Sequence, residues 1–420
     1  MNHSNESVVI IGAGHAGGAL AGYLRQYGFG GAITLLGAEA TPPYQRPPLS
    51  KAWLKDSADT ESLLLKPQDW YQDHSVALRL GCKVEQVDAG AQRVLLAGGE
   101  TVAYTQLVFA TGAAARRLAL PGAGLQGVLC LRDLGDAAQI KARLRGASRL
   151  AIIGGGYIGL EVAATARHFG VEVVVLEREP RLLSRSASAP VAAWLHALHA
   201  AQGVDFHFGA DIAAIEGTAG QVTALRLADG HSEACDLVLV GIGAEPHSAL
   251  AQGLGAVTDG GIVVDAEGRT SLPDVWALGD ATRRPLAHFP GLFRLESVPS
   301  ALEQARRVAC VLVGRELPAH ELPWFWSDQY ATKLQIAGMT ALSDTTVLRG
   351  DPLAHRFTAF HLRAGVLCAA ECVNSPGEFL AAKKAIAAQA RPDPHCLADA
   401  ATPLAQTFAR AAQTALSTVF

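Results

Sequence analysis

Short β-branched runs, each followed by a glycine-rich turn and an amphipathic stretch, dominate the hydrophobic pattern of this chain. Residues 8–11 form the first run, and apolar positions then recur at helical spacing through Arg25. A second apolar run follows at residues 33–36. This order predicts strand, tight turn, helix and strand, which is the opening of a βαβ unit.

The same pattern restarts in the middle of the chain. Residues 150–153 read as a strand, 154–159 as a glycine turn, 160–169 as a helix and 171–177 as a second strand. The chain therefore contains an internal repeat of two βαβ nucleotide-binding units. We expect an α/β protein with two Rossmann-like nucleotide-binding domains.

The segments outside these repeats suggest how the domains are arranged. Residues 84–110 alternate in polarity around turns and predict a small meander. A helix is predicted over 300–313, with Ser300 and Glu303 as its capping box. After Pro323 the chain is rich in aromatic residues, then in strand patterns and short helices.

A length of 420 residues is too great for one compact core. We predict a discontinuous FAD-binding domain over 1–115 and 245–322, an NAD-binding domain over 116–244 and a C-terminal α+β domain over 323–420.

Composition narrows the class of partner. Half of the residues are apolar and 18% are charged, as in a folded globular protein. The net charge is −4, and no run of Lys or Arg is long enough to follow a nucleic-acid backbone. No apolar stretch reaches membrane-spanning length, and the first residues lack the charged start of a signal peptide. We expect a cytoplasmic protein that binds neither nucleic acid nor membrane, with a monomer favoured.

The cysteines and histidines predict neither a metal site nor a redox disulfide. The seven cysteines are scattered without a CxxC pair, which favours reduced thiols. Cys368 and Cys372 lie in an apolar, strand-like run and are interpreted as buried structural thiols. His196 and His199 share one helix face, but no carboxylates or cysteines surround them in sequence, so we interpret that face as solvated.

Each glycine turn has the spacing that a dinucleotide requires, between a predicted strand and a predicted helix. The first glycine permits a tight turn, the second lets a pyrophosphate approach the backbone, and the third allows close packing of helix on strand. The phosphates would lie at a helix N-terminus, where free amides favour negative charge. These positions are Gly12, Gly14 and Gly17 in the first unit and Gly154, Gly156 and Gly159 in the second.

One glycine turn per cofactor suggests a flavin in the first unit and a nicotinamide in the second, and the acidic residues after the turns bear on the choice between NADH and NADPH. Glu177 ends the second strand of its unit, where a carboxylate accepts hydrogen bonds from a ribose diol, and this favours NADH. Arg178 follows at once and would tolerate the extra phosphate of NADPH. Glu39 is the corresponding acid in the first unit. Gly279 and Asp280 end a predicted strand and would contact the flavin cofactor, with the helix near Ser300 directing its positive end at the flavin ring.

These residues and the strings around them resemble the putidaredoxin reductase-like ferredoxin reductases, within the pyridine-nucleotide flavoprotein superfamily. The resemblance extends over essentially the whole chain, and it implies a glutathione reductase-like fold for the two Rossmann-like domains, with the C-terminal α+β domain added. It rests on VVIIGAGHAG, PYQRPPLSKAWL, FATG, LRDLGDA, IIGGGYIGLEVA, GIGAEP, ALGD, LESVPSALEQA and PWFWSDQY in that order. RPPLSK and PWFWSDQY make it specific.

The resemblance implies residue roles that the pattern alone does not give. Lys51 would lie beside the flavin, Arg132 and Asp280 would hold FAD, and Glu161 and Glu177 would meet the nicotinamide cofactor. Lys51 and Glu161 are therefore the predicted catalytic residues. Further predicted cofactor-binding residues lie within the quoted strings: Ala16, Arg46, Thr111, Gly112, Ile158, Gly243, Val298 and Trp326. Trp326 belongs to an aromatic cluster with Trp324, Phe325 and Tyr330. Three interpretations of this cluster stay open: it covers the flavin, it lies between the flavin and the partner, or it only packs a core.

The predicted activity is transfer of electrons from NADH, through FAD, singly to a 2Fe-2S ferredoxin that supplies a haem monooxygenase or Rieske dioxygenase. A rubredoxin reductase, an NADH oxidase or peroxidase, and a redox-sensing flavoprotein with slow turnover are the alternatives. The absence of a redox cysteine pair disfavours the oxidase or peroxidase. Electrons must then leave the reduced flavin by another route, and a reduced flavin can release them one at a time. An acidic ferredoxin would dock on basic residues, for which the candidates are Arg306, Arg307, Lys383 and Lys384.

Overall fold

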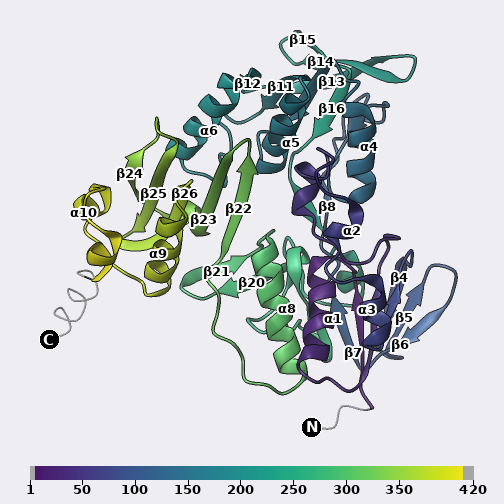
Figure 1. The fold of residues 1–420 in the computed structure, drawn as a ribbon. Helices are drawn as coiled ribbons and strands as arrows, with labels where there is room; N and C mark the ends of the chain where they lie inside the picture. Colours follow the sequence, from purple (N-terminus) through teal and green to yellow (C-terminus); the bar gives the residue numbers. More distant parts are fainter. Residues whose placement is uncertain (1–4, 410–420) are drawn as a thin grey trace. The chain divides into compact units, whose positions relative to one another are not determined.

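A computed structural model of the chain describes residues 5–409 (Figure 1). Residues 1–4 and 410–420, which the predicted first and third domains include, lie outside the described residues. The chain divides into two compact units. Of the described residues, unit 1 comprises 5–46, 58–114 and 244–321, and unit 2 comprises 47–57, 115–243 and 322–409.

Unit 1 is built on a five-stranded parallel sheet in the order β19-β7-β1-β2-β3. Helices α1 and α8 pack side by side on one face of this sheet and enclose an apolar core with it (Figure 1). The elements are β1 (Ser7–Ile11), α1 (His15–Gln26), β2 (Ala32–Leu36), β3 (Val76–Arg79), β7 (Gln106–Phe109), β19 (Val275–Ala277) and α8 (Val298–Leu312).

A second apolar core covers the opposite face of this sheet. Val8 and Ile10 of β1 face the helices, whereas Val9 and Ile11 face the second core, as strand alternation requires. The unit also contains an antiparallel sheet of β4–β6, a mixed sheet of β18, β20 and β21, and short helices. These elements are β4 (Val84–Asp88), β5 (Arg93–Leu96), β6 (Thr101–Ala103), β18 (Ile262–Val263), β20 (Thr282–Leu286), β21 (Phe289–Phe293), α2 (Thr60–Leu63), α3 (Gln68–Asp73) and α7 (Ala249–Gly253).

Unit 2 contains a second parallel sheet, in the order β12-β11-β10-β16-β9. Its elements are β9 (Val128–Leu129), α4 (Leu134–Leu144), β10 (Arg149–Ile153), α5 (Tyr157–His168), β11 (Glu172–Glu177), α6 (Ala189–Ala201), β12 (Val204–Phe208) and β16 (Leu237–Val240). An antiparallel sheet of β13 (Ile212–Thr218), β14 (Gln221–Leu227) and β15 (Ser232–Ala234) packs on it.

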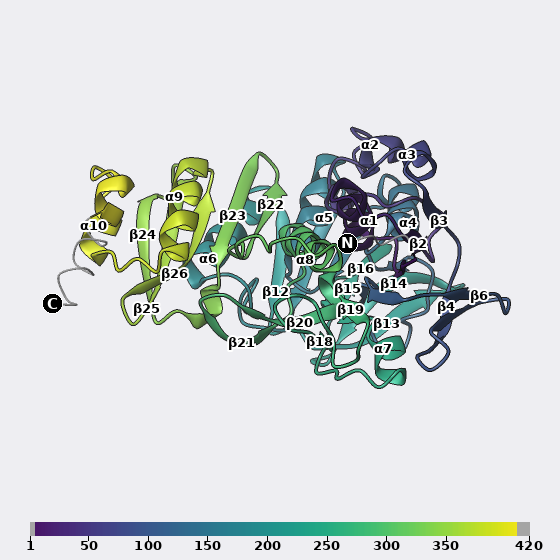
Figure 2. The same ribbon diagram turned by 90° about the horizontal axis from the view of Figure 1, so that it is seen from below.

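The C-terminal part of unit 2 is an antiparallel sheet in the order β22-β23-β26-β25-β24, with α9 against β26 and β23 (Figure 2). Its elements are β22 (Trp324–Gln329), β23 (Thr332–Gly338), β24 (Thr345–Asp351), β25 (Arg356–Arg363), β26 (Val366–Val373), α9 (Pro376–Ala387) and α10 (Pro394–Ala398). Two Rossmann-like sheets and a C-terminal α+β region confirm the predicted fold class. The exact domain boundaries remain a prediction.

Two helix starts differ from the predicted ones. Helix α8 begins at Val298, and the side chain of Ser297 accepts a hydrogen bond from the amide of Ser300 at 3.3 Å. Pro299 fits the first turn of a helix, where no amide is needed, so the helix starts earlier than the Ser300 capping box suggested. That capping box was wrong. Helix α5 likewise begins at Tyr157, directly after the glycine turn.

Among residues 5–409 no helix is both long and apolar enough to cross a membrane.

Candidate functional site

The first glycine turn of unit 1 is shaped by contacts that exclude side chains. Gly12 has a φ of 116°, and a Cβ there would overlap the carbonyl of Ala110. A Cβ at Gly17 would overlap the carbonyl of Gly12, so α1 approaches the turn closely. A Cβ at Gly14, in contrast, would meet nothing nearer than Nη2 of Arg46, at 4.0 Å. This open space beside a helix N-terminus and an arginine fits a diphosphate.

Two further polar groups at the turn support this fit. Nδ1 of His15, the first residue of α1, is buried without a hydrogen-bond partner among the described residues. Burial lowers the pKa of His15, although nearby Asp280 opposes the shift. Arg46 Nη2 lies 2.5 Å from Glu39, whose other carboxylate oxygen accepts a hydrogen bond from Tyr44 at 2.6 Å. Glu39 is therefore tied to the arginine beside the open turn.

The remaining predicted flavin ligands of unit 1 come from two other strand ends and from the start of α8. Gly279 follows β19 with a φ of 80°, and a Cβ there would lie 3.0 Å from the Cβ of Ala16 on α1. Asp280 is the next residue. Thr111 and Gly112 follow β7, and the Thr111 hydroxyl donates to the carbonyl of His247 at 2.7 Å. Val298 is the first residue of α8.

The glycine turn of unit 2 repeats this geometry. Gly154 has a φ of 101°, and a Cβ there would lie 2.6 Å from the carbonyl of Gly241. A Cβ at Gly159 would lie 2.9 Å from the carbonyl of Gly154, whereas one at Gly156 would meet nothing nearer than 3.8 Å. The turn is tight at its first and third glycines and open at its middle one. It fits the diphosphate of a second nucleotide.

Glu177 holds the second turn in place. One carboxylate oxygen accepts the amide of Gly155 at 2.6 Å and the other accepts the amide of Glu179 at 2.8 Å. A carboxylate has further acceptor sites, so these bonds orient Glu177 and leave capacity for a ribose diol. Arg178 is 82% exposed and lies 3.8 Å from Glu179.

Two predicted positions near this turn are open to a ligand. Ile158, in the first turn of α5, is an exposed hydrophobic side chain, with 46% of its surface accessible. Gly243, after β16, has a φ of 102° and open space where a Cβ would lie.

The predicted catalytic residues, Lys51 and Glu161, form an ion pair within unit 2. Lys51 Nζ lies 2.5 Å from Oε2 of Glu161, and Glu161 is 6% exposed. Lys51 directly follows a single 3-10 turn, η1 (Pro47–Ser50), which packs on α5. Thr165, one turn after Glu161 on α5, donates its hydroxyl to the carbonyl of Ser50 at 2.9 Å. The hydroxyl of Ser50 donates to Glu161 as well.

Sequence reasoning named Lys51 and Glu161 separately and did not predict their ion pair. It also missed Ser50 and Ser327, which donate to Glu161, and Thr165, which donates to the backbone of Ser50. Only the helical spacing of Glu161 and Thr165 indicates that they share one face of α5.

Two further predicted cofactor residues lie elsewhere in unit 2. Arg132 lies just before α4, and its amide donates to Asp136 at 2.9 Å. Trp326 of β22 is half-buried, 5.6 Å from the ring of Trp324.

The cysteines are all free thiols. Burial raises the pKa of Cys368 to about 11 and that of Cys372 to about 12. Both therefore stay protonated at neutral pH and are poor redox nucleophiles.

Two predictions about surface residues were wrong. Arg307 is 4% exposed, because Nε donates to the carbonyl of Ala266 at 2.9 Å and Nη1 to that of Pro318 at 2.7 Å. It cannot contact a partner, whereas its neighbour Arg306 is exposed. His199 is fully buried, so its side of α6 is not a solvated face.

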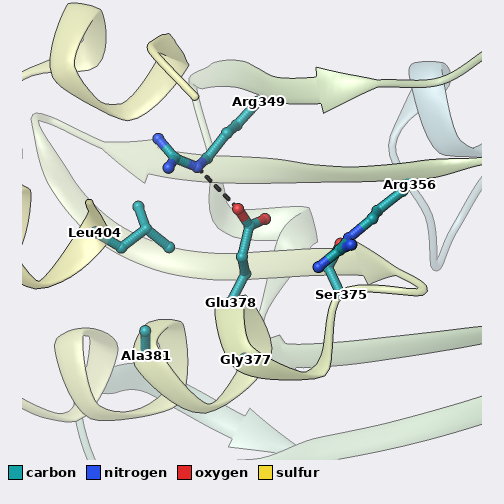
Figure 3. Close-up of a pocket in the computed structure, with 7 residues that line it drawn as sticks. All are labelled: Arg349, Arg356, Ser375, Gly377, Glu378, Ala381 and Leu404. Carbon is teal, nitrogen blue, oxygen red and sulfur yellow. Dashed lines mark hydrogen bonds and ion pairs between the residues drawn. The ribbon is translucent and has the colours of Figure 1, made fainter. Parts of the chain in front are cut away.

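The pocket in Figure 3 lies in the C-terminal part of unit 2 and contains none of the predicted cofactor residues. Arg349 donates to Glu378 at 2.8 Å. Its other nitrogens donate to the backbone carbonyl of Leu397 in α10 and to those of Asp399, Ala400 and Thr402 directly after it. Arg349 thus anchors the chain end of the described part.

Comparison with known proteins gives matches over nearly the whole chain. The family model described as pyridine nucleotide-disulphide oxidoreductase matches residues 6–305, and the model described as reductase C-terminal matches residues 324–408. The probable ferredoxin reductase CtmF of Castellaniella defragrans is 44% identical over 385 residues, 91% of this chain and 94% of the relative.

Two further matches agree with these. Putidaredoxin reductase CamA of Pseudomonas putida is 38% identical over 97% of this chain and 98% of the relative. The crystal structure of the covalent putidaredoxin reductase–putidaredoxin complex matches with a TM-score of 0.95 and 38% identity, covering 97% of this chain and 99% of that one. The resemblance inferred from the sequence strings is confirmed.

Proposed function

The chain belongs to the pyridine nucleotide-disulphide oxidoreductase family, and we propose that it is an NADH:ferredoxin reductase that passes electrons from NADH, through FAD, singly to a 2Fe-2S ferredoxin. Two open glycine turns in one chain carry this proposal, because each leaves space for one dinucleotide at a helix start. One turn belongs to unit 1 and the other to unit 2.

The cofactors are FAD and NAD(H), as in the family. Gly14, Arg46 and Asp280 would hold FAD in unit 1, and Gly156, Ile158 and Glu177 would hold NADH in unit 2. Bound FAD supplies the conversion between hydride transfer and one-electron transfer. The protein's own residues bind and orient the cofactors and exclude water. Each turnover consumes one NADH and two oxidised ferredoxins and releases NAD⁺, two reduced ferredoxins and one proton.

The cysteines favour direct electron transfer from the flavin to ferredoxin over transfer through a redox disulfide. The buried Cys368 and Cys372 are the only pair close in sequence, and their raised pKa values keep both as thiols. Relatives of the chain named as ferredoxin reductases include a component of the anthranilate 1,2-dioxygenase system and one of the p-cumate 2,3-dioxygenase system. The ferredoxin is proposed to supply a Rieske dioxygenase or a haem monooxygenase, and the dioxygenase systems named for these two relatives support the first.

The docking surface is proposed to be basic, since an acidic ferredoxin would be steered to it. Arg306 on α8 of unit 1 and Lys384 on α9 of unit 2 are exposed cations. Lys383 is half-buried, with Nζ 5.2 Å from the ring centroid of Trp324. Each unit therefore offers its own test positions, and a monomer suffices for the proposed reaction.

The deciding experiment is anaerobic. NADH is added to the purified yellow protein, flavin bleaching is followed, and a 2Fe-2S ferredoxin is then added with cytochrome c as final acceptor. We expect rapid bleaching and cytochrome reduction that requires ferredoxin. Rapid bleaching with rubredoxin as the better acceptor would identify a rubredoxin reductase. A long-lived complex of reduced flavin and NAD⁺, with slow turnover on every acceptor, would identify a redox sensor and contradict the proposal.

A further inference from the structure

The Glu161 carboxylate receives hydrogen bonds on both of its oxygens, all within unit 2. Lys51 and Ser50 donate to Oε2, as described above. On the other side, the hydroxyl of Ser327 in β22 donates to Oε1 at 2.7 Å. Ser327 is 1% exposed. A strand of the C-terminal sheet thus contacts the predicted catalytic carboxylate of α5 directly.

Ser327 is the first member of a buried chain of hydrogen bonds. Gln329, two residues along β22, donates Nε2 to the Ser327 hydroxyl at 3.0 Å. Its Oε1 lies 2.7 Å from Nε2 of His199 on α6. Nδ1 of His199 lies 3.2 Å from the hydroxyl of Tyr330. Gln329 and His199 are 2% and 0% exposed, so water does not compete for these groups.

The hydrogen bonds from Tyr330 to Glu161 all run in one donor-to-acceptor direction. A carboxylate only accepts, so Ser327 donates to it and must accept from the Gln329 amide nitrogen. The amide oxygen then accepts from His199, which places the imidazole proton on Nε2 and leaves Nδ1 to accept from Tyr330. Burial lowers the pKa of His199 to about 4, and burial raises the pKa of Tyr330 to about 12. At neutral pH both residues hold the protons that this direction needs, and every donor points toward Glu161.

The backbone at the end of this chain adds an independent observation. Tyr330 has a φ of 54°, in the left-handed region, in the two-residue connection between β22 and β23. A bulky residue rarely adopts this conformation, which glycine or asparagine adopts readily. Such strain persists where surrounding contacts hold it. The hydrogen bond from Tyr330 to the buried His199 is one such contact.

From this geometry we infer that Ser327 is a positioning residue that fixes the Glu161 carboxylate, and through it the Lys51 ammonium, with Gln329 and His199 holding Ser327 in turn. The inference rests on the proposed function, because it assigns the Lys51–Glu161 pair to the reductive half-reaction. A lysine and a glutamate have several rotatable bonds each, and an exposed pair would sample many arrangements. The buried chain restricts Glu161 to one arrangement.

The kinetic test compares Ser327→Ala with Ser327→Thr, which keeps the hydroxyl. The matched control is Ser375→Ala, which removes a buried hydroxyl that donates to the carbonyl of Val373, away from Glu161. Flavin reduction by NADH is followed anaerobically over a range of NADH concentrations. For Ser327→Ala we expect the limiting rate to fall about tenfold with unchanged NADH affinity and flavin content. Ser327→Thr should return to within about threefold of wild type, and Ser375→Ala should match wild type.

A second readout does not depend on turnover. NMR of isotope-labelled histidine should show the His199 proton on Nε2, with the signal assigned by its loss in His199→Gln. In Ser327→Ala the Gln329 amide loses its acceptor, so its two ends become free to exchange, and the His199 signal should shift toward the other tautomer. If Ser327→Ala does not fold, Gln329→Met is the alternative variant. It removes the hydrogen bonds that hold Ser327 and should also lower the limiting rate of flavin reduction.

Three outcomes would overturn the inference. Ser327→Ala could keep the wild-type limiting rate, could lose rate only through weaker NADH binding or lost flavin, or could leave the His199 tautomer unchanged. Failure of the proposed function is distinguishable, because wild-type protein would then fail to reduce ferredoxin, whereas these results compare variants with a working wild type.

Discussion

The two glycine turns of this chain have similar backbone conformations but differ in the charged side chain that lies beside each turn. Gly12 and Gly154 have φ values of 116° and 101°. Ile11 pairs in register with Leu36 in unit 1, and Ile153 pairs with Leu176 in unit 2. The first strand, turn and helix of the two βαβ units therefore correspond position by position. Leu36 lies 25 residues after Ile11, whereas Leu176 lies 23 residues after Ile153, so the second strands correspond after an offset of two residues.

That alignment separates two acids which the sequence suggested were equivalent. Glu177 directly follows Leu176, whereas the residue that follows Leu36 is Gly37. Glu39 comes two residues later and is tied to Arg46 and Tyr44. Unit 2 thus places a carboxylate at the turn itself, while unit 1 places an arginine beside its open glycine. The helices differ as well, because Ala19 of α1 occupies the position that Glu161 occupies in α5.

The largest expected effects come from adding one methyl group to each turn, which tests whether the two turns bind different cofactors. Gly12→Ala would introduce a Cβ that overlaps the Ala110 carbonyl, and Gly154→Ala one that lies 2.6 Å from the Gly241 carbonyl. Positive φ adds about 1–3 kcal/mol of strain at each site. We expect Gly12→Ala to lose FAD, and Gly154→Ala to retain FAD while losing most NADH affinity. Flavin absorbance and NADH titration measure the two effects.

A control for this pair is Gly22→Ala, on α1, where a Cβ would meet nothing within 4 Å. It should keep both cofactors. Loss of FAD from Gly154→Ala as readily as from Gly12→Ala would mean that the turns do not act separately.

These turns are also where sequence was most informative. Their glycines, flanking strands and helices follow from local spacing, so the fold class and both nucleotide turns could be predicted. The contacts of Ser50, Thr165 and Ser327 with the rest of unit 2 are hydrogen bonds between segments far apart in sequence, and no local pattern signals them. Arg306 and Arg307 show the same limit, because adjacent residues of a helix point about 100° apart and only tertiary packing decides which is buried.

The second prediction compares a half-buried histidine of unit 1 with a fully buried one of unit 2. Within residues 5–409, His15 Nδ1 of unit 1 has no hydrogen-bond partner, whereas both ring nitrogens of His199 in unit 2 are hydrogen-bonded. Burial lowers the pKa of His199 from 6.5 to about 4. The unfolded chain therefore binds the proton first as pH falls, and stability contributed by neutral His199 is lost between about pH 6.5 and pH 4, by about 3 kcal/mol.

Calorimetry of the unfolding transition that includes α6 measures this loss across that pH range. We expect His199→Gln to flatten the acid side of the stability curve, although its stability at neutral pH falls. The control, His196→Asn, changes a half-buried histidine three residues earlier on the same helix and should keep the wild-type slope. An unchanged slope in His199→Gln would show that His199 does not set the acid limit of unit 2.

The third prediction tests the acid that distinguishes the turns. Glu177→Gln keeps the acceptor oxygen but removes the charge beside the second turn. We expect the KM for NADH to rise about tenfold, or about 1.4 kcal/mol, with the preference for NADH over NADPH reduced. Flavin content should not change. Steady-state kinetics with both nucleotides provides the measurement, and Glu179→Gln, two residues later and partly exposed, is the matched control. Equal losses in both variants would count against a specific role for Glu177.

The smallest expected effect compares exposed cations of the two units as docking residues. Arg306→Ala in unit 1 and Lys384→Ala in unit 2 should each raise the KM for ferredoxin about threefold at low salt, and the difference from wild type should shrink as salt screens the interaction. Lys83→Ala and Arg143→Ala remove exposed cations elsewhere in unit 1 and unit 2 and should change little. Reduction of the flavin by NADH should be unaffected in all four, because it needs no ferredoxin. An effect confined to one of the two test variants would assign docking to that unit, and a wild-type KM in both, with turnover independent of salt, would remove the basic surface from the proposal.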